Sequence, residues 1–188
     1  MSEEDGPSVV IVGQAPRSFT HHPSHEVWVV NGPRVPPRWD RLFQLHGLDH
    51  IRQVDRDGAL WELLTHVDQL GGQRLVMYRA CDELPAAERY PLTEVIDSLP
   101  AHRPYLTGSF ALTIALAVHE GFRRIILDGV QFWGSLDHWS AGEAWAVPCI
   151  EYHIGRAEAR GIDVQVPEGS GLFRHDNFVY GFEGPGSV

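Results

Sequence analysis

The fold of this chain is decided by the stretch Val9-Val10-Ile11-Val12-Gly13-Gln14-Ala15-Pro16, a buried-strand pattern stopped by a glycine and a proline. A second stretch, Tyr105-Leu106-Thr107-Gly108-Ser109, opens a long apolar helix, and a strand at 125–129 follows that helix. In a parallel α/β sheet, both turns fall at strand carboxyl ends or helix N-termini, where ligands bind. Small residues there let a phosphate approach backbone N–H groups. If the two turns meet, the chain is predicted to hold a nucleotide-like anion.

The pattern of apolar residues predicts alternating strands and helices. Strands are expected at 8–12, 26–30, 41–45, 74–78, 124–128 and 162–166, and helices at 57–70, 92–99, 107–120 and 149–160. This order predicts an α/β fold with a mainly parallel central sheet of about six strands, flanked by helices. Thr107 is expected to cap the helix that it opens, and Gly121 to end that helix.

A chain of 188 residues is most simply one domain. We expect residues 1–7 to be disordered and residues 8–183 to form a single nucleotide-binding domain. The polar and aromatic stretch 134–147 is typical of a loop or lid. One short strand is expected at 178–182, ahead of a flexible tail at 184–188.

Composition and charge narrow the classes of partner. The formal net charge of −10 argues against duplex nucleic acid, because such binding needs a basic field. Cys81 and Cys149 have neither a disulfide pattern nor metal-ligand spacing, which is typical of a reducing compartment. The acidic N-terminus does not resemble a signal peptide, and the apolar helix at 110–118 is too short to span a bilayer. We therefore expect a cytoplasmic protein with no membrane partner, and the six tryptophans suggest a homo-oligomer interface.

The turn after the first strand, with Gly13, Gln14 and Ala15, is a candidate ligand-binding turn. It lacks the GxGxxG pattern of dinucleotide-binding folds and the GK[ST] ending of a P-loop, so NAD and ordinary ATPase chemistry are poorly supported. The Gln14 amide could contact a base or ribose, or the segment could simply be a tight turn. Asn31 has the same two interpretations, because its amide can bind a ligand or form part of a turn with Gly32.

The start of the 107–120 helix is a candidate anion site, because Thr107, Gly108 and Ser109 combine hydroxyls, a glycine and a helix N-terminus. Ordinary capping by Thr107 explains the pattern equally well. A glycine inside the first turn would cost about 1 kcal/mol relative to alanine, which is easier to understand if a ligand approaches the backbone. Asp128 and Gly129 end the next strand, and Asp128 could bind a ribose or a metal.

Aromatic and histidine side chains supply the remaining candidates. Trp133 could stack on a base, although packing in a core or lid is the commoner fate of tryptophan. His138 and His153 are the candidates for a general base, with a structural role as the alternative for each. His46 and His50 are four residues apart but lack the HExxH pattern, so we expect no metal site and no required cofactor.

Together these segments resemble the Rossmann-like superfamily that contains the bacterial α-2,3-sialyltransferases. The resemblance rests on the stretches 10–16, 29–31, 106–109, 121–122 and 125–133. Proteins similar to 6-hydroxymethylpterin pyrophosphokinase, and small phage and prophage proteins, look similar as well. The likeness implies a Rossmann-like fold whose turns hold the cytidine monophosphate part of a nucleotide-sugar donor.

The resemblance also implies roles for individual residues. Gln14 stands where the family has an asparagine, Asn31 matches a second asparagine, and Trp133 matches a tyrosine. The family's catalytic histidine has no matching motif here, and His138 and His153 are both candidates. The residues implied to line the nucleotide are Gly13, Gln14, Ala15, Asn31, Thr107, Gly108, Ser109, Asp128, Gly129 and Trp133.

Three functions are compatible with this sequence. The first is a nucleotide-binding transferase, most concretely a glycosyltransferase that uses a CMP-type sugar and so binds a nucleotide or nucleotide sugar. The second is a pyrophosphokinase-like transfer from ATP to a small alcohol, which would need Mg²⁺ held by a carboxylate such as Asp128. The third is a phage-type protein that sequesters a nucleotide or signal molecule without catalysis.

Overall fold

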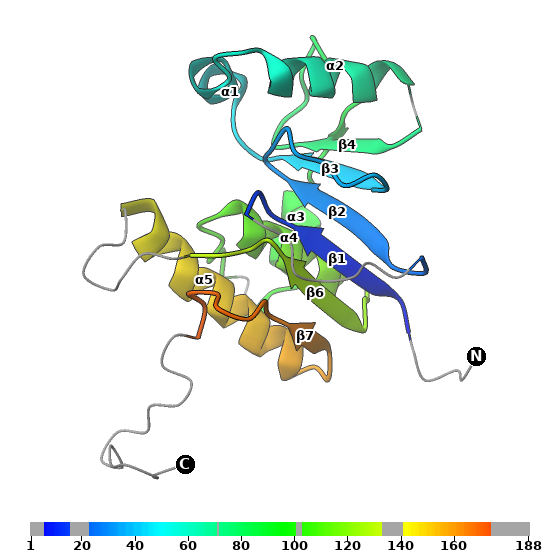
Figure 1. Cartoon of the computed structure of the whole chain (residues 1–188). Coiled ribbons are helices and arrows are strands. Elements are labelled where there is room, and N and C mark those ends of the chain that lie inside the picture. The colour runs from blue at the N-terminus through cyan, green and yellow to red at the C-terminus, as the bar shows by residue number, and fades with distance from the viewer. Residues whose placement is uncertain (1–5, 16–22, 71, 101–102, 133–140, 174–188) are drawn as a thin grey trace.

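The computed structural model describes residues 6–15, 23–70, 72–100, 103–132 and 141–173 (Figure 1). Within these ranges the chain forms a seven-stranded sheet in the order β5-β4-β3-β2-β1-β6-β7, and every neighbouring pair is parallel. The strands are β1 (Ser8–Val12), β2 (Glu26–Val30), β3 (Arg41–Gln44), β4 (Arg74–Met77), β5 (Glu88–Arg89), β6 (Arg124–Asp128) and β7 (Asp163–Gln165). The helices are α1 (Leu48–Val54), α2 (Ala59–Leu70), α3 (Leu92–Asp97), α4 (Ser109–His119) and α5 (Ala141–Glu158). The predicted α/β, Rossmann-like fold with a mainly parallel sheet is confirmed, with one strand more than expected.

β1 lies inside the sheet because every side chain from Val9 to Val12 is apolar and β-branched. Successive side chains of a strand point to opposite faces, so such a strand must be covered on both faces. All four side chains are fully buried. Val12 is in register with Val29 of β2 and with Asp128 of β6, so these three strands end at the same level.

The two faces of the sheet have separate hydrophobic cores. One core joins Ile11 and Trp28 to α3, α4 and α5. The other joins Val10 and Val29 to α1 and α2. Figure 1 shows these layers, with α1 and α2 on one side of the sheet and α3, α4 and α5 on the other. The sheet is therefore the middle layer of three.

α4 is apolar around most of its circumference, as expected for a helix covered on several sides. It ends as predicted at Gly121, whose φ of +85° is the left-handed conformation that favours glycine. Gly121 N–H donates to Val118 C=O at 3.3 Å, and Phe122 N–H donates to Ala117 C=O at 3.1 Å. These two bonds form a Schellman motif, which satisfies carbonyl groups at the helix end.

α5 differs most from the prediction. It begins at Ala141, so residues 141–147 belong to a helix and not to a loop or lid. Pro148 lies inside this helix, which was expected to begin only at residue 149. A proline removes the hydrogen bond to the carbonyl group four residues earlier, and here the helix continues on both sides of it. Residues 134–140 of the expected lid, residues 1–5, and the strand and tail expected after 173 lie outside the described residues.

Two short elements were not predicted, α1 and β5. α2 begins later than expected because Asp55 holds its first turn, accepting N–H bonds from Leu60 at 3.0 Å and Trp61 at 2.7 Å.

None of the helices in the described ranges is both long and apolar enough to cross a membrane.

A buried ion network joins β2, β3 and α4 at the amino end of the sheet. Arg41 pairs with Glu26 at 2.6 Å and with Glu120 at 2.7 Å, and its side chain is 10% exposed. Its guanidinium also lies over the Trp28 ring, 4.8 Å from the ring centroid. One cation thus lies between two carboxylates that would otherwise repel each other.

We predict that Arg41→Met destabilises the fold by about 3 kcal/mol, because it leaves Glu26 and Glu120 together without a cation. Arg124→Met is the matched control, since Arg124 also begins a strand but its ion pair with Asp163 is more exposed. That change should cost no more than about 1 kcal/mol. Urea unfolding at constant pH measures both, and equal losses would contradict the prediction.

Candidate functional site

The order in which strands are added to the sheet reverses at β1. Strands β2 to β5 are added on one side of β1, and α4 then carries the chain across to β6 and β7 on the other side. At such a switch point, open α/β sheets form a crevice outside the carboxyl ends of their strands, and ligands bind there. The turns at 13–15, at 31 and at 128–129 all lie at this edge. Contacts between these turns show how closely they approach.

Two backbone hydrogen bonds tie the turn after β1 to the turn after β6. Gly13 N–H donates to Asp128 C=O at 2.7 Å, and Ala15 N–H donates to Gly129 C=O at 3.2 Å. A Cβ atom on Gly13 would lie 2.3 Å from the Gly129 carbonyl oxygen, and Gly129 has a φ of +67°. The contact between the two turns therefore explains both glycines. The Asp128 side chain is fully buried here.

Asn31 connects the end of β2 to the start of α4. Its Nδ2 donates to Ser109 Oγ at 2.6 Å, and its Oδ1 accepts the Leu45 N–H at 3.1 Å. Its φ of +54° is left-handed, a conformation that asparagine adopts more readily than most residues. Because Ser109 Oγ accepts the bond from Asn31, the hydroxyl hydrogen of Ser109 must point elsewhere. This contact therefore joins the turn after β2 to the start of α4.

Gln14 binds the neighbouring backbone in this structure. Its Nε2 lies 3.4 Å from the Val30 carbonyl oxygen, and its Oε1 accepts the Arg34 N–H at 3.3 Å. A Cβ atom on Gly32 would overlap the Gln14 side chain. Gln14 thus packs into the turn that follows β2, and contact with a base or ribose stays a prediction.

α4 starts later than predicted. Gly108 is its N-cap residue and no side chain caps the helix, so the prediction that Thr107 is the cap is wrong. The Thr107 hydroxyl instead donates to the Trp145 carbonyl oxygen of α5 at 2.7 Å. Leu112 N–H makes the first helical bond, to Gly108 C=O at 3.1 Å, so helix geometry gives no acceptor to the N–H groups of residues 109–111. This end of α4 can therefore bind an anion.

Gly108 is the N-cap residue and lies outside the body of the helix. The cost of about 1 kcal/mol relative to alanine, expected for a glycine inside the first turn, therefore does not apply. Its φ of −165° is extended backbone, which any residue adopts. A Cβ atom at this position would lie 3.4 Å from the Ala146 Cβ, an ordinary contact distance. Neither its conformation nor its described neighbours require a glycine at 108.

His153, a predicted general base, is buried on α5 with both ring nitrogens occupied. Nε2 lies 2.7 Å from the Tyr105 carbonyl oxygen, and Nδ1 lies 3.0 Å from Arg156 Nη1. Since a guanidinium can only donate, Nδ1 is the acceptor and Nε2 carries the proton. Burial, more than any other cause, lowers the pKa of His153. The geometry therefore gives His153 a structural role, joining α5 to the segment ahead of α4.

Tyr105 and Cys149 are a further part of this junction that the sequence did not predict. Cys149 Sγ–H donates to the Tyr105 carbonyl oxygen at 3.3 Å, and Cys149 Sγ lies 3.3 Å from the Thr107 backbone nitrogen. These contacts involve backbone atoms, which every residue has, so no sequence pattern could have signalled them. Trp133 and His138 lie outside the described residues.

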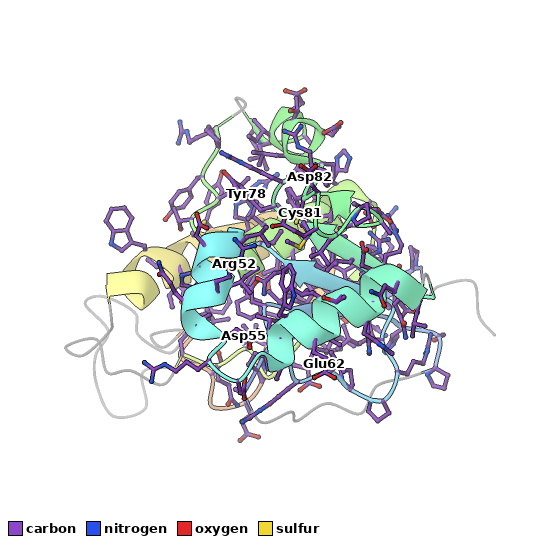
Figure 2. The ribbon with its side chains drawn as sticks, turned by 90° about the horizontal axis from the view of Figure 1, so that it is seen from above. Arg52, Asp55, Glu62, Tyr78, Cys81 and Asp82 are labelled. Carbon is purple, nitrogen blue, oxygen red and sulfur yellow. The ribbon has the colours of Figure 1, made fainter. Side chains whose placement is uncertain are left out.

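A second cluster of polar side chains lies in the segments that follow β3 and β4. The His46 and His50 rings have centroids 4.7 Å apart, and burial followed by the charge of His50 lowers the pKa of His46. Figure 2, viewed over α1 and α2, labels Arg52 of α1 and Cys81 of the segment after β4. Both side chains bind Glu83, at 2.8 and 3.2 Å. Within the described ranges, no three His, Cys, Asp or Glu residues form a group that could hold a metal ion.

Comparison with known proteins shows a likeness of fold. No protein-family model matches this chain, and no curated protein matches it. Solved structures of the sialyltransferase CstII are similar to this chain, among them the three that follow. The Campylobacter jejuni enzyme in complex with cytidine-5′-monophosphate has a TM-score of 0.53 at 12% identity, covering 88% of this chain and 84% of that chain. A single-residue variant in complex with CMP has a TM-score of 0.53 at 11% identity, covering 88% of this chain and 89% of that chain. The complex of CstII with a trisaccharide acceptor and CMP has a TM-score of 0.51 at 12% identity, covering 88% of this chain and 89% of that chain.

Identities this low show a shared fold. The predicted likeness to bacterial sialyltransferases is confirmed at that level. The comparisons give no support to the predicted likeness to pterin pyrophosphokinases and phage proteins.

We predict that two replacements of Asn31 separate its side-chain bonds from its backbone conformation. Asn31→Gly removes both side-chain hydrogen bonds and should cost about 2 kcal/mol. Asn31→Ala removes the same bonds but keeps a Cβ atom on a left-handed residue, so it should be about 1 kcal/mol less stable than Asn31→Gly. Urea unfolding measures the difference. Equal stability of the two variants would show that the left-handed conformation is not retained.

We predict that His153 makes stability fall as the pH falls. The unfolded chain takes up a proton at the ordinary histidine pKa of about 6.5, whereas the folded chain keeps His153 neutral to lower pH. Acidification from pH 7.5 to pH 5.5 should therefore cost the wild type up to about 1 kcal/mol more than His153→Gln. Both proteins retain His46, so its contribution cancels. Parallel curves of unfolding free energy against pH would contradict the prediction.

Proposed function

We propose that this chain binds a nucleotide at the carboxyl edge of its sheet, and that it acts as a glycosyltransferase with a CMP-type sugar donor. One observation carries the proposal. The N-terminus of the crossover helix α4 lies at the strand-order switch point and is joined to the end of β2 by the Asn31–Ser109 hydrogen bond of 2.6 Å. The likeness in fold to sialyltransferase structures that contain CMP supports this choice of ligand.

The phosphate would bind at the start of α4. The N–H groups of residues 109–111 have no helical acceptor, and the helix dipole places partial positive charge at the same end. The Ser109 hydroxyl accepts a bond from Asn31, so its own hydrogen can be donated to a phosphate oxygen. These donors are held in place before the ligand binds. They would therefore stabilise the negative charge that develops on the phosphate during the reaction.

The chemistry assigned to this site is transfer of a glycosyl group. The acceptor hydroxyl oxygen forms a bond to the anomeric carbon while the bond from that carbon to the phosphate oxygen breaks. CMP leaves with the bonding electron pair, and a general base takes the acceptor proton. The negative charge that grows on the leaving phosphate is the charge that the N-terminus of α4 would stabilise.

The remaining roles are proposals from the sequence. Trp133 would stack on the base, and His138 would take the proton from the acceptor. His153 is the weaker candidate for the base, because Tyr105 and Arg156 occupy its ring nitrogens. Gln14 would have to give up its contacts with the backbone of residues 30 and 34 in order to reach a ribose or base.

We predict that Gly108→Ala weakens CMP binding at least tenfold while leaving the fold intact. The added methyl group fits against Ala146 at 3.4 Å, but it would stand where a phosphate approaches the start of α4. Gly47→Ala is the matched control, because Gly47 is also a helix N-cap without a side-chain cap bond and has no atom within 4 Å of the added Cβ. Both variants carry the same loss of a favourable N-cap residue.

Calorimetric titration with CMP and a CMP-sugar measures these affinities, and thermal melting checks the fold. Wild-type protein that fails to bind either ligand at millimolar concentration would overturn the proposal, as would Gly108→Ala that binds as tightly as the wild type. Release of CMP from the CMP-sugar identifies transfer or hydrolysis. Tight binding without release would support the nucleotide-sequestering alternative, and magnesium-dependent consumption of ATP would support the pyrophosphokinase alternative.

A further inference from the structure

α5 carries exposed aromatic rings along one face. Trp145 is 69% exposed and Tyr152 is 39% exposed, and Pro148 between them is exposed as well. Residues three and seven positions apart lie on the same side of a helix, so these three form a continuous stripe. We call it the α5 stripe. It extends roughly 10 Å along the helix axis, at 1.5 Å per residue.

One end of the α5 stripe lies beside the proposed phosphate site. The Trp145 carbonyl oxygen accepts the Thr107 hydroxyl at 2.7 Å, directly ahead of the start of α4. The next residue, Ala146, is the neighbour that a Cβ atom on Gly108 would meet at 3.4 Å. The stripe therefore begins where the proposed donor phosphate would lie, and it leads away from that point along α5.

The far end of the stripe is held rigidly. The Tyr152 ring packs edge-on against the Tyr105 ring, with centroids 5.5 Å apart, and against the His153 ring at 5.2 Å. The Arg156 guanidinium lies over the Tyr152 ring at 5.9 Å. Neighbours on three sides thus fix this ring while leaving part of its surface open. A surface that is ordered in advance loses little entropy when a ligand covers it.

We propose that the α5 stripe is the platform that binds the acceptor, and that the acceptor is a carbohydrate. This inference rests on the proposed glycosyltransferase function. Sugar rings present a face of C–H groups bordered by hydroxyls, and such a face stacks on an aromatic ring while the hydroxyls stay in water. A short sugar chain laid along the stripe would bring its terminal hydroxyl to the start of α4.

The size of the stripe favours a small partner over a protein. Aromatic side chains bury about 150–250 Å² each when fully covered, so the exposed fractions of Trp145 and Tyr152 leave on the order of 250 Å² to be covered. A stable protein interface needs about 800 Å² on each side. A second copy of this chain would therefore find too little apolar surface here, whereas a few sugar rings would cover it.

The experiment uses the full chain, fluorescently labelled, on an array of mammalian and bacterial oligosaccharides with CMP present. Saturation-transfer NMR on the glycans that bind then gives affinities for the variants. We expect Trp145→Ala to weaken glycan binding about tenfold or more, and Trp145→Phe, which keeps an aromatic face, to retain most of it. Leu70→Ala is the control, because Leu70 is similarly exposed, at 63%, but lies on α2. It should bind glycans as the wild type does.

Absence of glycan binding by the wild type, or equal binding by Trp145→Ala, would overturn this inference. Thermal melting of each variant excludes loss of fold as the reason for loss of binding. CMP titration of the same samples separates the two proposals. CMP binding without glycan binding would remove only the carbohydrate platform, and glycan binding at Trp145 without CMP binding would remove only the proposed donor site.

Discussion

β1 pairs with β2 on one side and with β6 on the other, and this double pairing decides where the candidate site lies. It places the turn after β1 against the turn after β6, where the Gly13 N–H reaches the Asp128 carbonyl oxygen at 2.7 Å. It also requires the chain to cross the sheet between β5 and β6, and α4 makes that crossing. The N-terminus of α4 consequently lies at the strand-order switch point. If β6 were paired at an outer edge, the same residues would have no crevice to share.

The two ends of the sheet differ in how their polar groups are arranged. At the amino end, Arg41 lies between two carboxylates and over a tryptophan ring, an arrangement that stabilises the fold and leaves little free to bind a ligand. At the carboxyl end, Asn31 holds a left-handed conformation and uses its amide to orient Ser109. Backbone in sparsely populated conformations is often found at functional sites, where neighbouring contacts maintain it. This contrast agrees with a binding site at the carboxyl end.

Much of the fold could be predicted because its signals are local. The apolar β-branched run of β1 and the left-handed glycine after α4 each act within a few residues, and both were predicted correctly. Predictions that needed knowledge of distant neighbours were less accurate. Thr107 has the chemistry of an N-cap residue, but its hydroxyl bonds to α5, 38 residues further along the chain. Pro148 is a strong local stop signal, yet α5 continues through it.

The same division applies to the candidate site. Small and polar residues at strand ends could be recognised from the sequence, but whether the first turn lies near the start of α4 could not. The partner of each side chain could not. Gln14 and Asn31 are both amides after strands, yet Gln14 packs into a neighbouring turn while Asn31 reaches Ser109. His153 had the chemistry of a general base, but its ring nitrogens are committed to Tyr105 and Arg156.

The sequence by itself determined the order of the described strands and helices other than α1 and β5, and the set of polar residues available at strand ends. Hydrophobic periodicity and turn chemistry act over short distances along the chain, so they can be read locally. Only the tertiary structure decided which of those residues meet, which hydrogen bonds they have already made, and which aromatic rings on α5 remain uncovered. Such contacts join residues tens of positions apart. They depend on how whole elements pack, and no local pattern of residues records that packing.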